Sequence, residues 1–155
     1  MKRISISFLL TFLLLIILSA CQENKWMDWK LMNDQWLAKH KADTGFVTTS
    51  SGLCYKVIHQ GLYPKKPNVS SWIIANYKGR LIDSSEFDSG QYNNYLSGAI
   101  KGWQEGIKKM NVGGSYTFYI PSALGYDTIS TNSKIPPHSV LIFDVELIDS
   151  DPTVN

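Results

Sequence analysis

The sequence predicts an α+β domain in which a curved antiparallel β-sheet wraps over one short α-helix. Two observations predict this class: segments with strand-like alternation dominate from Phe46 onward, and a single amphipathic helical segment interrupts them. The chain has 155 residues, and what remains after an N-terminal leader is enough for one domain with its own core.

The first 20 residues read as a targeting leader and not as part of the fold. A basic start at Lys2 and Arg3 precedes an apolar run over 8–18, which is shorter than a typical transmembrane helix. The run ends in small residues before Cys21, a pattern that resembles the lipobox of bacterial lipoproteins. The resemblance implies a signal peptide over 1–20 and acyl chains such as palmitate on Cys21. The alternative is an ordinary cleaved signal peptide with a chance cysteine.

A lipidated Cys21 would hold the mature chain on a membrane without crossing it, because several acyl chains together anchor durably. Gln22 follows the cysteine, in place of the aspartate associated with inner-membrane retention in enteric bacteria. We therefore expect the outer membrane of a bacterial cell envelope.

Charge and cysteine usage exclude several function classes. Without Lys2 and Arg3, 13 of the 15 basic residues remain against 13 acidic residues, so the formal net charge is zero. A neutral chain without a basic cluster does not favour nucleic acid as a partner. Cys54 and three separate histidines do not form a metal site, and no cofactor is expected. Cys54 lies in an alternating pattern and is interpreted as a half-buried structural thiol.

Residues 24–42 predict a helix, because Trp26, Trp29, Met32 and Trp36 recur at helical spacing with charged residues between them. Gly45 ends this segment. We therefore assign 21–45 to a lipid-attached helical segment, 46–150 to the globular domain and 151–155 to a tail. The tryptophan stripe allows three interpretations: packing on its own domain, a stalk above the membrane, or a homodimer interface through Trp26, Trp29 and Trp36.

Four segments of the globular part predict strands: 52–61, 70–81, 115–121 and 140–148. Between the second and third lies 99–110, where Ile100, Trp103, Ile107 and Met110 share one helical face. The opposite face is polar and carries Lys101, Gln104, Glu105 and Lys108.

The sequence lacks a nucleophile elbow, a phosphate-binding glycine loop and paired metal ligands. Its motifs, in order, are SGLCYKVI, NYKGRL, EFDSG, AIKGWQEGIKKMNVGG, IPSALGY and IPPHSVLIFDVELI. This series, from about Thr49 to Ile148, closely resembles the FKBP-type peptidyl-prolyl cis–trans isomerases. The resemblance implies a sheet of about five strands, half-wrapped around the short helix, with an apolar pocket that accepts a proline ring.

Position by position, the resemblance also implies the site. Trp103 matches the pocket floor, Asp88 a polar residue at the rim, and Tyr126 the tyrosine whose hydroxyl bonds a carbonyl of the bound peptide. The expected walls and the contact at the pocket mouth are Tyr77, Phe87, Ala99, Ile100, Phe143 and Ile135.

Two adjacent prolines, Pro136 and Pro137, precede the last predicted strand. Each has a fixed φ and restricts the residue before it to extended conformations. We expect them to hold the loop 127–135 at a set angle above Phe143, so that the pocket binds without first ordering its own rim.

Three departures from the family pattern stand out. The segment 89–99 is shorter than in typical bacterial members. The family usually has an aromatic wall residue in this segment, and Tyr95 or Tyr92 takes its place, although a strict count of positions places Asn94 there. Ala99 replaces the usual valine. Asp127 follows Tyr126 where glycine is normal.

The resemblance implies a prolyl isomerase that acts on proline-containing polypeptides and assists the folding of envelope proteins. The alternative is a catalytically weak module that keeps the fold and binds peptides as a chaperone.

Overall fold

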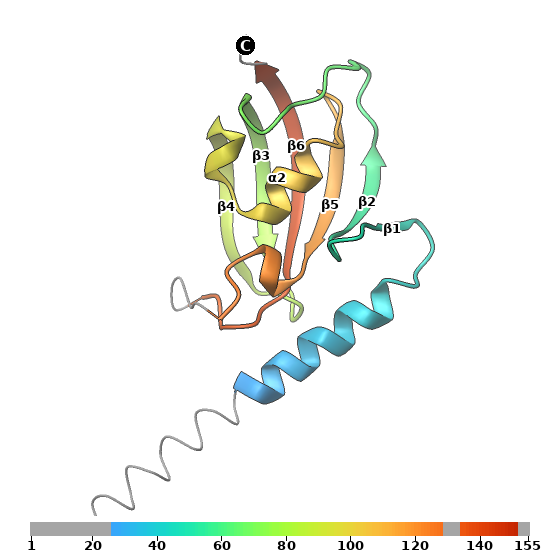
Figure 1. The fold of residues 1–155 in the computed structure, drawn as a ribbon, viewed down its shortest axis with the longest axis vertical. Helices are drawn as coiled ribbons and strands as arrows, with labels where there is room; N and C mark the ends of the chain where they lie inside the picture. The colour runs from blue at the N-terminus through green and yellow to red at the C-terminus, as the bar shows by residue number, and fades with distance from the viewer. Residues whose placement is uncertain (1–25, 129–133, 152–155) are drawn as a thin grey trace, which may run out of the picture.

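The computed structural model describes residues 26–128 and 134–151 and contains one six-stranded antiparallel sheet in the order β1-β2-β5-β6-β3-β4 (Figure 1). A helix over 26–40 precedes the sheet, and the short helix α2 lies across it (Figure 1). The α+β prediction is confirmed. The elements are β1 Phe46–Thr48, β2 Cys54–His59, β3 Trp72–Arg80, β4 Glu86–Tyr95, the 3-10 turn η1 Leu96–Gly98, α2 Lys101–Ile107, β5 Ser115–Ile120, the 3-10 turn η2 Ser122–Leu124 and β6 Leu141–Asp151.

All four segments predicted as strands are strands, namely β2, β3, β5 and β6. Two strands were not located from the sequence, β1 and β4. β4 forms one edge of the sheet, and most of its side chains are exposed. Because only Phe87 and Tyr92 of this edge strand are turned away from solvent, the strand shows no regular apolar alternation, and its Gly, Ser and Asn residues look like a turn.

Alternate strand residues build two apolar clusters on opposite faces of the sheet. Tyr55 pairs with Phe118, and Phe118 pairs with Phe143, so these residues face α2 and the main core. Cys54 pairs with Tyr119 and therefore faces the other way, where it joins a smaller cluster. Cys54 is fully buried, with its sulfur 3.3 Å from the hydroxyl oxygen of Thr48, and so is more buried than expected.

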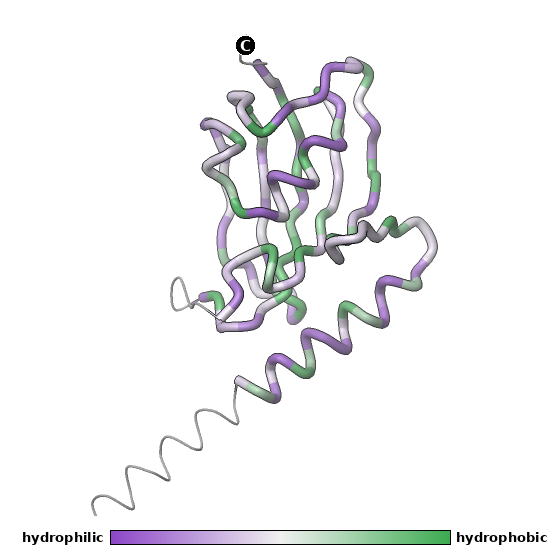
Figure 2. The backbone as a smooth tube through the Cα atoms, viewed as in Figure 1, coloured by the Kyte–Doolittle hydropathy of each residue, from purple (hydrophilic) through white to green (hydrophobic). Residues whose placement is uncertain are grey.

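The smaller cluster lies under the N-terminal helix, whose apolar and polar residues alternate along its length (Figure 2). Leu37 is buried there, and the Trp36 ring lies 5.9 Å from that of Tyr119. Asn33 is fully buried, and its amide oxygen accepts a 2.8 Å hydrogen bond from the backbone N–H of Val140. The indole N–H of Trp29 donates to the hydroxyl of Ser139 over 3.0 Å. The helix therefore packs on its own domain, which was the first of the three interpretations of the tryptophan stripe.

Across the part of the chain that the structure describes, no helix is both long enough and apolar enough to span a membrane. The predicted signal peptide, Cys21 and most of the predicted tail lie outside the described residues.

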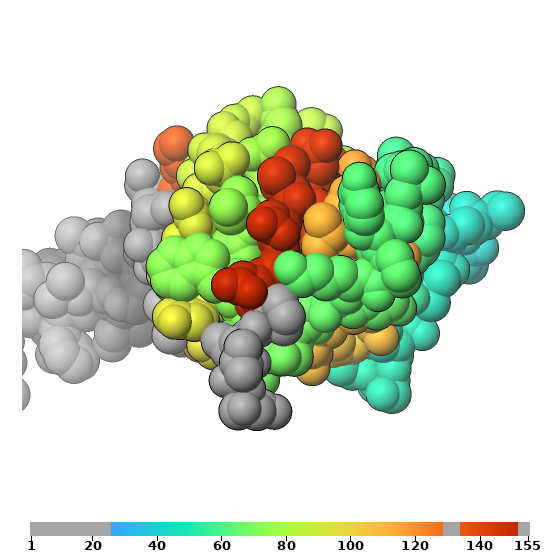
Figure 3. Space-filling model, turned by 90° about the horizontal axis from the view of Figure 1, so that it is seen from above, coloured from blue at the N-terminus to red at the C-terminus, as the bar shows by residue number. Residues whose placement is uncertain are grey.

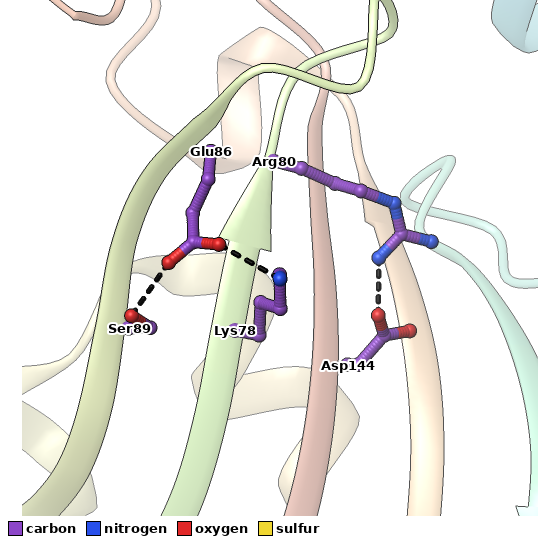
Figure 4. A network of polar contacts seen from close by, with 5 residues as sticks. All are labelled: Lys78, Arg80, Glu86, Ser89 and Asp144. Carbon is purple, nitrogen blue, oxygen red and sulfur yellow. Dashed lines mark hydrogen bonds and ion pairs between the residues drawn. The ribbon is translucent and has the colours of Figure 1, made fainter.

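Ion pairs on the face of the sheet opposite α2 link neighbouring strands (Figure 4). Lys78 lies 2.8 Å from Glu86, which also accepts a hydrogen bond from Ser89, and Arg80 contacts Asp144. Seen from the end of the sheet at which β6 ends, β6 is flanked by β3 and β5 (Figure 3). Because exposed pairs stabilise little, these contacts mainly favour the strand register.

The two glycines of the GWQEG motif allow α2 to lie directly on β5. A Cβ added at Gly102 would come within 2.5 Å of Ile120, and one at Gly106 within 2.5 Å of the Phe118 ring. Trp103, between them, faces the same core. The motif therefore combines close helix–sheet packing with one large aromatic residue.

We expect Gly106→Ala to lower the free energy of unfolding by about 2 kcal/mol, because Phe118 is fully buried and cannot move aside. The clash outweighs the gain of about 1 kcal/mol in helix propensity. Urea unfolding measures the change. Lys101→Ala, on the exposed side of α2, is the control, and equal stability of the two variants would contradict this packing.

Candidate active site

A pocket of about 330 Å³ opens between α2, η1 and the strands β3, β4 and β6. Asp88 is the one charged residue among those that line it, so the pocket is largely apolar and aromatic. The lining residues are Tyr77, Asp88, Tyr92, Gly98, Ala99, Ile100, Trp103, Tyr126 and Phe143.

Trp103 forms the floor of this pocket. Its ring is surrounded edge-on by three others, with centroid distances of 5.4 Å to Tyr77, 5.4 Å to Tyr92 and 5.3 Å to Phe143. Only 4% of Trp103 is exposed, yet it contributes to the pocket lining, so the floor is rigid and still accessible from above. Edge-to-face pairs of this kind add about 0.5–1.5 kcal/mol each beyond burial.

Asp88 and Tyr77 form the polar side of the pocket. The Tyr77 hydroxyl donates a 2.8 Å hydrogen bond to the Asp88 carboxylate. Burial, followed by this hydrogen bond and the nearby Asp88 charge, raises the pKa of Tyr77 to about 12. Tyr77 is therefore a neutral donor at physiological pH and keeps the carboxylate of Asp88 oriented.

The raised Tyr77 pKa predicts a loss of stability at high pH. An unfolded tyrosine ionises near pH 10, whereas folded Tyr77 ionises near pH 12, so the unfolded chain releases its proton first. The stability that Tyr77 provides is complete below about pH 10 and disappears between about pH 10 and 12. Urea unfolding of wild type and Tyr77→Phe at about pH 9 and 11 checks this: wild type should lose more stability than the variant.

Tyr126 lies at the rim, following η2. Burial and the charge of Asp88 raise the pKa of Tyr126, so its hydroxyl stays protonated. No hydrogen-bond partner of this hydroxyl is found among the described residues, which leaves it available to a ligand.

Asp127 adopts a φ of 53°, the left-handed region in which glycine is favoured, and its carbonyl accepts a 2.7 Å hydrogen bond from the N–H of His138.

Two predicted site residues lie behind the pocket lining. Phe87 is buried, with its ring 5.3 Å from that of Phe143, so it supports a wall without lining the pocket. Gly79 makes room for it, because a Cβ there would come within 2.5 Å of the Phe87 ring. Ile135 is buried as well, and part of the loop before it lies outside the described residues.

The placement of Tyr95 in the pocket is wrong. On β4, Tyr92 pairs with the buried Ala75 and so faces α2, whereas Tyr95 pairs with Trp72 on the outer face. Tyr95 is 46% exposed and its ring packs edge-on against Trp72. Tyr92 is the aromatic wall, and its hydroxyl donates a 2.8 Å hydrogen bond to the Tyr95 carbonyl. Asn94 shares the Tyr92 face but is exposed.

The remaining predicted residues come together as expected, with Ala99 and Ile100 side by side in the wall. Gln104, which the helical pattern placed on the solvent face, turns its amide back toward the pocket wall instead. No group of three or more His, Cys, Asp or Glu among the described residues could hold a metal ion. The site thus offers shape, apolar surface and a few hydrogen-bond donors.

Comparisons with known proteins agree with this geometry. A family model for FKBP-type peptidyl-prolyl cis-trans isomerases matches residues 63–148. The probable FKBP-type peptidyl-prolyl cis-trans isomerase FkpA of Neisseria meningitidis serogroup B is 40% identical over 124 residues, covering 77% of this chain and 45% of that protein. The outer membrane protein MIP of Legionella longbeachae is 34% identical over 124 residues, covering 77% of this chain and 53% of that protein.

The crystal structure of FkpA from Escherichia coli superimposes with a TM-score of 0.81 at 32% identity, covering 99% of this chain and 76% of that one. The chain spans about half the length of the curated relatives that it matches. Since the family model matches more than half of the sequence, this chain belongs to the FKBP-type peptidyl-prolyl cis-trans isomerases.

Proposed function

We propose that this chain catalyses the cis–trans isomerisation of X–Pro bonds and so assists the folding of cell-envelope proteins. The observation that carries the proposal is the open aromatic pocket of about 330 Å³ above Trp103, which suits a proline ring. Family membership and the relatives named as isomerases support it.

The mechanism requires no acid, base or covalent step. Rotation about an X–Pro bond faces a barrier of about 20 kcal/mol, because the planar amide loses resonance when it twists. The twisted amide has less charge separation than the planar one, so a dry aromatic pocket disfavours the planar ground state more. Only such differential interactions accelerate the step, and each 1.4 kcal/mol or so of difference gives about a tenfold rate increase.

The polar groups of the pocket would orient the peptide. The Tyr126 hydroxyl, which has no hydrogen-bond partner among the described residues, is a donor for a carbonyl next to the proline and would hold the peptide in the strained turn. The Asp88 carboxylate, which accepts a hydrogen bond from Tyr77, is an acceptor in the same pocket.

An isomerase assay on a proline-containing tetrapeptide, using the chain from Gln22 onward, tests the proposal. Clear acceleration that Tyr126→Phe or Asp88→Val abolishes is the expected result. Rapamycin that quenches Trp103 fluorescence without any turnover would instead support the alternative, a binding or chaperone module that keeps the fold without catalysis.

We also propose that Cys21 carries a lipid anchor that holds the domain at the outer membrane. The LSAC pattern at 18–21 supports it, as does the name of the relative called outer membrane protein MIP. Labelling with a palmitate analogue tests the anchor: wild type should be labelled and recovered with membranes, and Cys21→Ser should be unlabelled and released.

A homodimer through the N-terminal helix is a further proposal. Trp29 and Trp36 are half-buried against their own domain, so such a contact would rely on the exposed Met27, Leu31 and Met32 around them. Sedimentation of the chain from Gln22 decides it, because a monomer at tens of micromolar would exclude the dimer.

A further inference from the structure

Trp29 of the N-terminal helix reaches the segment 136–140, which directly precedes β6. Its indole N–H donates a 3.0 Å hydrogen bond to the Ser139 hydroxyl, and that hydroxyl donates in turn over 2.7 Å to the carbonyl oxygen of Pro136. One hydroxyl can accept the first bond and donate the second. Ser139 is 4% exposed, so water has little access to it. A relay of two hydrogen bonds thus ties the helix to the backbone of this segment.

The segment 136–140 depends on such contacts, because its two prolines have no N–H and the first backbone donor is His138. The His138 N–H donates a 2.7 Å hydrogen bond to the carbonyl oxygen of Asp127. The Val140 N–H donates over 2.8 Å to the side-chain oxygen of Asn33. One end of the segment is therefore held by the N-terminal helix, and its middle holds the residue that follows Tyr126.

Both residues of the bond between His138 and Asp127 have a strained backbone. Their φ values are 63° and 53°, in the left-handed region that is unfavourable for residues with a Cβ. Such conformations persist only where the surrounding contacts hold them in place. Weaker contacts of the segment 136–140 would therefore allow both residues to relax to ordinary backbone conformations.

Tyr126 directly precedes Asp127 and contributes to the pocket lining. In the part of the chain that the structure describes, its hydroxyl has no hydrogen-bond partner that would fix the ring. Tyr77 and Tyr92, on β3 and β4, each donate a hydrogen bond within the domain. The place of the Tyr126 hydroxyl is thus set by the packing of its ring and by the backbone on either side, which includes the strained Asp127.

We propose that Trp29 is a positioning residue: through the hydroxyl of Ser139, the N-terminal helix holds Tyr126 where its phenol meets the bound proline peptide. The inference rests on the proposed isomerase activity and adds to it a residue that does not line the pocket. A tryptophan is suited to this role, because its ring packs against the main core while its N–H reaches the relay.

Two variants break the relay at different points. Trp29→Phe keeps an aromatic ring and removes the N–H, and Ser139→Ala removes the hydroxyl. Trp36→Phe is the matched control, since it is the same change on the same helix at a ring that lies 5.9 Å from that of Tyr119. Each variant of the chain from Gln22 onward is measured in two ways. Protease-free NMR exchange spectroscopy with a proline tetrapeptide gives kcat/KM, and the ring signals of ¹³C-labelled tyrosines report on the pocket.

Trp29→Phe and Ser139→Ala should each lower kcat/KM about fivefold, the factor that one hydrogen bond typically provides. The double variant should also lose about fivefold and not about 25-fold, because both changes break one relay. In each of these variants the ring signals of Tyr126 should move toward those of an exposed tyrosine, while those of the tyrosines on β3 and β4 stay. A merely structural role would move all three rings alike. The control should stay within about twofold of wild type and leave all three rings unchanged.

Three outcomes overturn the inference. They are wild-type kcat/KM in a folded Trp29→Phe chain, multiplied losses in the double variant, and a change of the Tyr126 signals that is absent or that the other two tyrosines or the control share. Wild-type turnover is measured in the same series, so its absence counts against the proposed function alone. In that case the ring signals decide the role of Trp29, since they require no catalysis.

Discussion

Replacing Trp103 with alanine is expected to lower kcat/KM for X–Pro isomerisation by about 100-fold or more. The indole is the pocket floor and makes edge-on contacts with Tyr77, Tyr92 and Phe143. Its removal leaves a hollow that water can enter, and under the proposed mechanism a wet pocket would no longer favour the twisted amide over the planar one. Because Trp103 is 4% exposed, the free energy of unfolding should also fall by about 3–5 kcal/mol.

Trp72→Ala is the matched control for this experiment. Trp72 is 39% exposed on the outer face of the sheet, where its indole N–H donates to Asn93 over 2.6 Å. We expect its loss to cost about 1 kcal/mol and to leave turnover within about twofold of wild type. Measuring both variants well below their melting temperatures separates lost catalysis from lost folding. A folded Trp103→Ala chain with nearly normal turnover would contradict the role of the floor.

The four inner strands of the sheet could be predicted from the sequence, and the two edge strands, β1 and β4, could not. In β6 and β3, alternating residues are sharply apolar on the α2 side, which gives a clear period of two. β4 lacks this contrast, because its outer edge and most of its side chains contact solvent. Its position beside β3 depends on long-range pairing, which local alternation does not encode.

The same reason explains which site residues were found. Trp103, Tyr77, Phe143, Asp88 and Tyr126 belong to motifs of fixed spacing, and the structure brings them into one pocket. Choosing between Tyr92 and Tyr95 required the register of β4 on β3. That register shifts by one residue near Gly79, where β4 has an extra residue at Phe87.

Gln104 was missed for a different reason. Helical periodicity places it on the polar side of α2, and this is correct for its Cα position. Periodicity does not reveal where a flexible amide turns, and here two backbone carbonyls of the preceding segment attract it. Polar residues that bond to backbone groups are hard to predict, because their partners appear only once the chain has folded.

Asn33 is the second such residue, and its replacement should have the largest effect outside the pocket. Its side chain is fully buried between the N-terminal helix and the domain. The amide nitrogen donates to the Trp29 carbonyl over 2.8 Å, and the amide oxygen accepts from the Val140 N–H over 2.8 Å. Asn33→Ala should therefore destabilise the packed helix by about 2–4 kcal/mol, since it removes both bonds and leaves the Val140 N–H buried without an acceptor.

The effect of Asn33→Ala should extend to the start of β6, because Val140 directly precedes this strand and Phe143 lines the pocket. Hydrogen exchange of the Val140 amide measures it: exchange should become about 30-fold faster or more, which corresponds to about 2 kcal/mol of lost protection. Gln35→Ala, an exposed amide on the same helix, controls for helix propensity and should leave this exchange unchanged. Because the bond joins residues 107 positions apart, unchanged protection in Asn33→Ala would mean that the helix does not pack on the domain in solution.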